Sequence, residues 1–328
     1  MTERRRVVSR RAEALAVMRD PAAYTVDDPR FATARVVGPS MLSTEGAEHH
    51  RHRAPFAAAF RLEAVRALQP AVQADAGALI DAFADAGEAE LRTQFAGPLA
   101  ATVMARILGI EATPVADVLR WYGAIVAATT AASEGREPGS EGAEAFADLA
   151  AAIGPSLGRA GDLSRSEVVS NAAVLLFGGI ETTEGMICNV VWHVLSHPDA
   201  LRRVREDPAL IGAAVEESLR LEPAAAVIDR YEAGGGDKVV VSLRGANRDP
   251  AVFEDADAFA LDRANRARHV TFAAGPHVCL GMHLARLEAH TALGVLLARL
   301  PGLELAQPTA PEGDVFRKPP ALRVRWSR

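Results

Sequence analysis

The chain has 328 residues, a formal net charge of −6 and 49% hydrophobic residues, which is the composition of a globular protein rather than of a disordered or fibrous one. Its two cysteines exclude a disulfide framework, no apolar run approaches the roughly 20 residues of a membrane span, and the N-terminus carries charges where a signal peptide needs an apolar core. We therefore expect a cytoplasmic protein without a membrane anchor, and the acidic total without a basic stripe argues against nucleic acid as a partner.

Helices are predicted over most of the first two-thirds of the chain, because Ala, Leu and Val recur there at helical spacing. Residues 10–20 form the first such stretch, and residues 47–61 form another that bends or restarts at Pro55. Glycine and proline mark residues 27–46 and 134–142 as loops.

The longest predicted helix runs from about Ser164 to His197. Ser164 and Glu167 have the S-x-x-E spacing of a capping box, and Pro198 ends the helix after His197. The middle of this helix, residues 171–180, is apolar on every side, which predicts that it passes through the centre of the protein.

The last third of the chain combines helices with short strands. A helix is predicted at 207–222, with a proline in its first turn. A strand is predicted at 237–245, a helix after Cys279 and a final strand at 321–326. The sequence therefore predicts one domain over residues 1–328, mainly α-helical with a minor β-sheet.

The stretch FAAGPHVCLGMHLAR, from Phe272 to Arg286, places Cys279 directly before a predicted helix. Free backbone N–H groups and the dipole at a helix start stabilise a thiolate, and the glycines let a flat ligand approach the backbone. Zinc would require further Cys or His ligands at characteristic spacing, whereas a lone thiolate suits haem iron, whose in-plane ligands come from the porphyrin. A buried structural cysteine is the alternative.

The pattern Phe272-x-x-Gly275-x-His277-x-Cys279-x-Gly281 resembles the haem-binding signature of the cytochrome P450 family, the haem-thiolate monooxygenases. The resemblance covers nearly the whole chain and departs mildly at Ala273, where the family has glycine. It implies a P450-like helical fold with haem b between the long central helix and the helix after Cys279. Cys279 would then be the iron ligand, with Phe272 and Gly281 beside the haem, and the N-terminal and sheet regions are trimmed relative to the family.

A second motif is the pair Glu217 and Arg220, which lie three residues apart and therefore share one helical face. Arg263 matches the third member of the family's Glu-Arg-Arg triad, so the resemblance implies that the three residues have a structural role. Taken alone, the first two would equally fit a solvated surface pair.

A third motif, Gly178-Gly179-Ile180-Glu181-Thr182, lies midway along the longest helix. Two glycines leave room beside the helix, and a Thr hydroxyl can bond a backbone carbonyl one turn back. Glu181 and Thr182 match the family's acid–alcohol pair, so the resemblance implies that they are catalytic and deliver protons, with Gly178 next to the haem. An ordinary helix with a packing glycine pair is the alternative.

A fourth motif concerns the two haem propionates, which need cationic or donor partners. His49 and Arg53 lie four apart in EHHRHR and match the family's H-x-x-x-R pair, and Arg230 and His277 match two further propionate ligands. The remaining residues of the stretch are expected to face solvent or a partner: His50, Arg51 and His52.

By resemblance, the protein is an oxidoreductase, a haem-thiolate monooxygenase that uses O2 to oxidise, most simply by hydroxylation, a small organic natural product. The sequence has no reductase domain or flavin motif, so electrons are expected from a separate ferredoxin and ferredoxin reductase and ultimately from NAD(P)H. Two alternatives are a peroxide-driven haem oxidase and a non-catalytic accessory protein of the same fold.

Substrate contacts are predicted by position at Val174, Phe177, Val227, Ile228 and Phe316. Because the loops that cover the distal side are short, we expect a smaller or more open pocket, closed by a second copy of the chain in a homodimer or by a carrier protein that holds the substrate. A basic landing surface for ferredoxin is also predicted. Its candidate residues are Arg51, His52, Arg266, Arg268 and Arg286.

Overall fold

The computed structural model describes residues 5–133, 136–137, 139–153 and 160–327, so the predicted loop at 134–142 lies partly outside the described residues. The helices are α1 (Arg11–Arg19), α2 (Ala32–Val37), α3 (Gly46–Ala57), α4 (Leu62–Ala67), α5 (Gln69–Asp81), α6 (Gly97–Leu108), α7 (Val115–Ser133), α8 (Ser140–Ile153), α9 (Arg165–Ser196), α10 (Pro198–Glu206), α11 (Ile211–Leu221), α12 (Leu243–Ala246) and α13 (Met282–Arg299). The strands are β1 (Arg5–Val8), β2 (Tyr24–Thr25), β3 (Glu88–Glu90), β4 (Val227–Glu232), β5 (Lys238–Ser242), β6 (Glu304–Leu305) and β7 (Arg323–Arg325).

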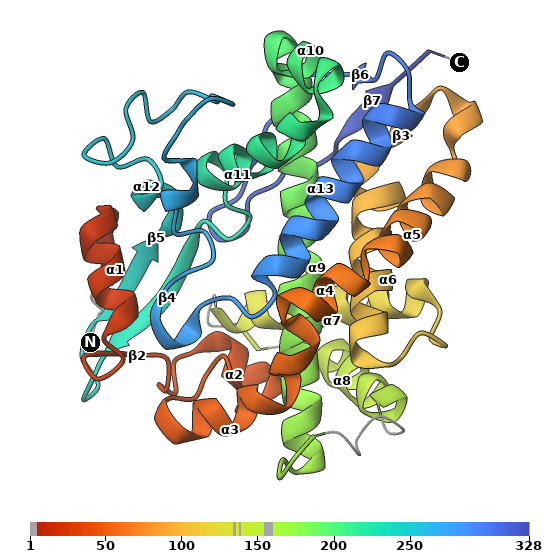
Figure 1. Ribbon diagram of the computed structural model, residues 1–328. Coiled ribbons are helices and arrows are strands. Elements are labelled where there is room, and N and C mark those ends of the chain that lie inside the picture. The colour runs from red at the N-terminus through yellow and green to blue at the C-terminus, as the bar shows by residue number, and fades with distance from the viewer. Residues whose placement is uncertain (1–4, 134–135, 138, 154–159, 328) are drawn as a thin grey trace.

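The long helix α9 runs through the middle of the molecule, and α6, α7, α11 and α13 pack around it (Figure 1). Its start is the predicted capping box: the Ser164 hydroxyl accepts the Glu167 N–H at 3.3 Å, and the Glu167 carboxylate accepts the Ser164 N–H at 2.7 Å. The predicted course of this helix is confirmed.

By length and composition α9 could cross a membrane, contrary to the expectation that no such stretch exists. However, 83% of its most apolar window is buried inside the protein. The neighbouring elements therefore cover the apolar surface of α9 on all sides, as expected for a helix in the core of the protein.

Two small sheets complete the mainly helical fold. One has the strand order β1-β5-β4-β2, with β1 parallel to β5, and the other has the order β3-β7-β6. The first sheet lies with α1 and α12 to one side of the helical body (Figure 1). The predicted strands at 237–245 and 321–326 are observed as β5 and β7. The strands β1, β2, β3 and β6 have only two to four residues each, whereas β4, with six residues, was not predicted.

A buried ion-pair cluster joins α11 to the segment that follows α12. Arg220 donates to both carboxylate oxygens of Glu217, at 2.9 and 2.8 Å, and Arg263 donates to the same carboxylate at 2.8 Å. The remaining donors of Arg220 bond the carbonyls of Asn247, Ala256 and Ala258. Since Glu217 and Arg220 are 0% exposed, the cluster holds a long irregular segment onto the helical body.

We predict that Glu217→Ala lowers the free energy of unfolding by about 3–5 kcal/mol, because it leaves Arg220 buried without a counter-charge. Urea unfolding of the purified protein measures the change. The matched control is Arg202→Ala on α10, which breaks two exposed ion pairs and should cost less than about 1 kcal/mol. Equal losses in the two variants would contradict a structural role for the cluster.

Candidate active site

A cavity of about 260 Å³ lies between the middle of α9 and the loop that contains Cys279. Its walls come from α6, α9, α13, the segment before α3 and the loop from Thr271 to Gly281. Most of the wall is apolar. The apolar side chains include Met41, Leu42, Phe60, Met104, Val174, Leu175, Met186, Ile228, Leu243 and Leu284.

Cys279 lines this cavity at the end of a short turn and three residues before α13 begins. Its N–H donates to the carbonyl of Phe272 at 2.9 Å, which closes the loop on itself. Burial raises the pKa of the Cys279 thiol, while the Gly281 N–H and the guanidinium groups of Arg53 and Arg286 act in the opposite direction. The expected helix-start environment of the sulfur is therefore present.

Backbone conformation fixes the shape of this loop. Gly275 has φ +72° and lies so close to the Met18 carbonyl that a Cβ atom could not fit. Ala273 has φ +60°, a left-handed conformation that costs a non-glycine residue about 1–2 kcal/mol. At this position the P450 pattern of the sequence analysis has glycine, and the backbone angle shows why.

The adjacent glycines Gly178 and Gly179 in the middle of α9 have different surroundings. A Cβ atom on Gly178 would meet nothing within 4 Å, whereas one on Gly179 would collide with the side chain of Met104 on α6. Gly178 therefore leaves open space toward the cavity, and Gly179 allows α6 and α9 to approach closely. The Thr182 hydroxyl donates to the Gly178 carbonyl at 2.5 Å and lines the cavity.

Glu181 points to a different set of partners from its neighbour Thr182. Its carboxylate accepts a hydrogen bond from the Tyr122 hydroxyl and lies 2.7 Å from the Lys318 ammonium. Lys318 also lies 2.7 Å from Glu184, which accepts from Arg92 at 2.7 Å. Glu181 is not among the residues that line the cavity.

Burial, followed by the neighbouring Glu181, raises the pKa of Tyr122, so this hydroxyl stays protonated and acts as a donor. The partners of Glu181 come from α7 and from the segment before β7. No local motif could have brought these segments together, and sequence reasoning missed them.

The residues predicted to bind propionates gather at one edge of the cavity. Arg53 and His277 line it, and Arg53 donates to the Val278 carbonyl at 2.7 Å. The rings of His49 and His277 lie 4.4 Å apart, centre to centre. His49 is buried, its Nε2 has no hydrogen-bond partner among the described residues, and burial together with His277 and Arg53 lowers its pKa to about 4.

Arg230 lies on β4 and is 5% exposed, although it does not line the cavity itself. Its side chain donates to the Asp229 carbonyl at 2.8 Å. Burial lowers the pKa of Arg230, and the nearby carboxylate of Glu45 opposes that shift. Glu45, which also accepts from His277, had no place in the sequence-based site.

The predicted substrate contacts divide into two groups. Val174 and Ile228 line the cavity. Phe177 and Phe316 instead pack against each other edge to face, with ring centres 5.4 Å apart, and neither they nor Val227 line it. The prediction that Phe177, Phe316 and Val227 line the cavity is therefore wrong.

A buried carboxyl group on α13 also lines the cavity. Glu288 is 1% exposed and its Oε2 has no hydrogen-bond partner among the described residues. Burial raises the pKa of Glu288 well above its usual range. The sequence analysis assigned no role to Glu288.

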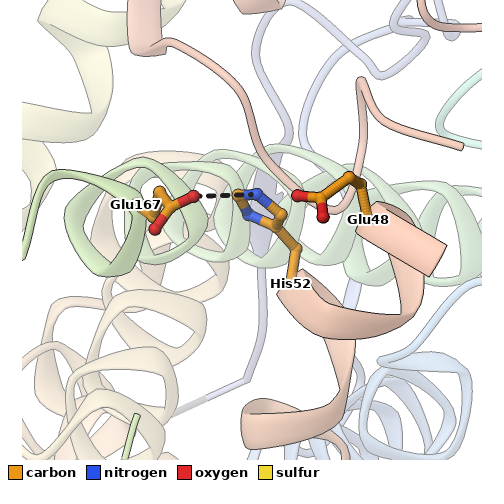
Figure 2. A group of neighbouring side chains, drawn as sticks. All are labelled: Glu48, His52 and Glu167. Carbon is orange, nitrogen blue, oxygen red and sulfur yellow. Dashed lines mark ion pairs between the residues drawn. The ribbon is translucent and has the colours of Figure 1, made fainter. Parts of the chain in front are cut away.

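His52 lies in a cluster with Glu48 and Glu167 that has the spacing of metal ligands (Figure 2). It is 1% exposed, not surface-facing as predicted, and its Nδ1 is 2.8 Å from the Asn171 amide. Arg51 already supplies the cation: it donates to Glu48 at 2.8 Å and to Glu167. The cluster joins α3 to α9 and needs no metal.

Most side chains of the predicted ferredoxin landing surface are buried or paired with other groups of the protein. His52 is buried, Arg51 is paired with two carboxylates, and Arg286 donates to Glu216 at 2.5 and 3.1 Å. Arg266 donates to backbone carbonyls. These side chains do not form a free basic surface.

Comparison with known proteins places this site in a family. The family model described as Cytochrome P450 matches residues 155–314. The chain is 32% identical to mycinamicin IV hydroxylase/epoxidase of Micromonospora griseorubida, with 92% of this chain and 83% of that protein covered. It is 33% identical to nocardicin C N-oxygenase of Nocardia uniformis subsp. tsuyamanensis, with 98% and 89% covered.

Among solved structures, the chain is similar to P450BioI in complex with an acyl carrier protein ligated with hexadec-9Z-enoic acid. The TM-score is 0.87 at 29% identity, and the match covers 98% of this chain and 92% of that chain. The expected P450-like fold is confirmed.

We predict opposite effects for alanine at the adjacent glycines Gly178 and Gly179 of α9. Gly178→Ala should raise the free energy of unfolding by up to about 1 kcal/mol, because alanine favours the helix and the added methyl group meets only open space. Gly179→Ala should lower it by about 1–2 kcal/mol, because the methyl group overlaps Met104. Urea unfolding under identical conditions measures both, and a loss in the first variant would contradict the open space.

Proposed function

The chain belongs to the cytochrome P450 family, and on that premise we propose that this monooxygenase hydroxylates a small, largely apolar natural product. One observation carries the proposal. The Cys279 thiol and the Thr182 hydroxyl come from different elements yet line the same cavity, whose other walls are mostly apolar. Such a cavity offers an apolar substrate a site with few polar groups.

The residues around the cavity fit a haem b group. A cysteine preceding a helix offers a thiolate. The edge near Arg230 holds donors with few acceptors: the Arg230 side chain makes one hydrogen bond, to a backbone carbonyl, in the described structure, and His49 Nε2 makes none. Two propionate carboxylates would satisfy them. When bound, the haem supplies O2 activation and oxygen transfer.

We assign the haem contacts to these residues as a proposal. Cys279 would supply the thiolate that binds the haem iron, and the Gly281 N–H, Arg53 and Arg286 would stabilise that thiolate. Phe272, Gly178 and Gly281 line the cavity and would lie beside the haem. The propionates are held by His49, Arg53, Arg230 and His277.

Thr182 and Glu181 supply the proton path in this proposal. The bond from Thr182 to the Gly178 carbonyl fixes the hydroxyl oxygen at the cavity wall, where it can accept and pass on a proton. Glu181 is the adjacent acid, but Lys318 and Tyr122 hold its carboxylate away from the cavity. Delivery from Glu181 therefore requires its side chain to exchange these partners for Thr182.

The substrate class is argued from the cavity and from the relatives. Two of the relatives bear the names of natural products, mycinamicin IV and nocardicin C. The apolar walls formed by Met41, Leu42 and Val174 favour an apolar substrate. The P450BioI structure contains an acyl carrier protein. This supports a variant of the proposal in which the substrate is bound to a carrier protein that closes the cavity. In the alternative, a second copy of the chain closes the cavity.

Electrons are proposed to come from a cytoplasmic ferredoxin and its NAD(P)H-dependent reductase. The structure suggests a different landing surface from the one predicted from sequence. Arg61 and Arg66 are exposed at α4, with no side-chain ion pair in the described part of the chain, and they flank the exposed Leu62. The neighbouring Phe60 lines the cavity beside Gly281. This surface suits an acidic partner.

We predict that the reduced, CO-bound protein shows the red-shifted Soret band of a thiolate-ligated haem. Cys279→Ser should abolish this band, while haem absorbance at other wavelengths remains. An unchanged band in the serine variant would rule out Cys279 as the ligand. Turnover with hydrogen peroxide but none with ferredoxin, reductase and NADPH would favour the peroxide-driven alternative. A colourless preparation would favour the accessory protein.

We predict that the double variant Arg61→Glu, Arg66→Glu raises the apparent KM for ferredoxin about tenfold and weakens its dependence on salt, because a repulsive surface replaces an attractive one. Steady-state NADPH oxidation with increasing ferredoxin measures both quantities. The control is Arg323→Glu on β7, also exposed, which should leave the KM unchanged. An equal effect of the control would exclude a local docking surface.

A further inference from the structure

A protein carboxylate already occupies the edge of the cavity that is proposed to receive the haem propionates. Glu45 directly precedes α3, yet its side chain does not cap that helix. One carboxylate oxygen accepts the Val26 N–H at 3.0 Å, and the other lies 3.0 Å from His277 Nε2. Glu45 thus ties the segment after β2 to the turn before Cys279.

Glu45 also compensates the buried charge of Arg230. Although burial by itself raises the pKa of Glu45, hydrogen bonds from His277 and Val26 and the charge of Arg230 leave it below its usual value. Glu45 is therefore a carboxylate at neutral pH. One of its oxygens lies 3.0 Å from His277 Nε2, and its charge also acts on Arg230.

The charges at this edge change when haem is bound. Arg53 and Arg230 match the two propionates in number, and His49, with a pKa of about 4, adds no charge at neutral pH. The carboxylate of Glu45 is then a third negative group. Haem binding must therefore work against the charge of Glu45, or displace its side chain toward solvent.

We propose that Glu45 is an internal counter-carboxylate that holds the propionate site together in the haem-free protein and weakens haem retention once haem is bound. This inference rests on the proposed haem site. It assigns to a single side chain two effects of opposite sign, one on the empty fold and one on the loaded protein. A residue with only a structural role would change both properties in the same direction.

The substitution Glu45→Gln separates charge from geometry. Glutamine has nearly the same shape and its amide oxygen can still accept from His277 or from Val26. It removes the negative charge that Arg230 faces. The haem-free variant should therefore melt at a lower temperature, by about 2–4 °C. Haem transfer from the loaded variant to excess apomyoglobin should be about tenfold slower, which corresponds to about 1.4 kcal/mol.

Two further variants serve as controls. Glu45→Asp keeps the charge and should release haem no more slowly than the wild type. Glu48→Gln removes a carboxylate from α3 that is exposed and paired with Arg51, and its haem transfer rate should stay within about twofold of the wild type.

Equal or faster haem loss from Glu45→Gln overturns the inference, and this result decides the matter even if the haem-free variant does not fold. Slower loss with an unchanged or higher melting temperature of the haem-free protein overturns the counter-carboxylate role in the empty fold. A wild-type protein that binds no haem overturns the proposed function itself, and the inference with it.

Discussion

Most buried charges in the described part of this protein are paired with opposite charges. Glu217 is matched by Arg220 and Arg263, and Glu222 by Arg244, Arg248 and Arg317. An uncompensated buried charge costs several kcal/mol, so these pairs determine how the irregular segments lie on the helices. Where donors remain without acceptors, at the cavity edge, the physical expectation is a ligand that carries negative charge.

The same constraint connects the cavity to the C-terminal segment. Arg317 is bound to Glu222, and its neighbour Lys318 lies between Glu181 and Glu184 on α9. Phe316, one residue earlier, packs on Phe177 of the same helix. The position of this segment and the partners of the proposed acid are therefore parts of one packing arrangement, and a change in one would be felt by the other.

The central helix reconciles stability with an open site by using neighbouring residues differently. A side chain of α6 occupies the space beside Gly179, whereas the space beside Gly178 is open. The Thr182 hydroxyl donates to the carbonyl of Gly178. Because successive residues of a helix point about 100° apart, one side of α9 can pack tightly while the next faces the cavity. The same reasoning explains why Glu181 and Thr182, adjacent in sequence, have different surroundings.

The sequence by itself determined the helical body, the course of α9, the helix after Cys279 and the family resemblance, because helical periodicity, caps and the cysteine loop are local patterns. Tertiary structure alone decided that His52 is buried, that Phe177 and Phe316 face each other and that Tyr122, Lys318 and Glu45 enter the site. These contacts join residues far apart in the chain, and their formation depends on how whole elements pack. No spacing along the sequence records that packing.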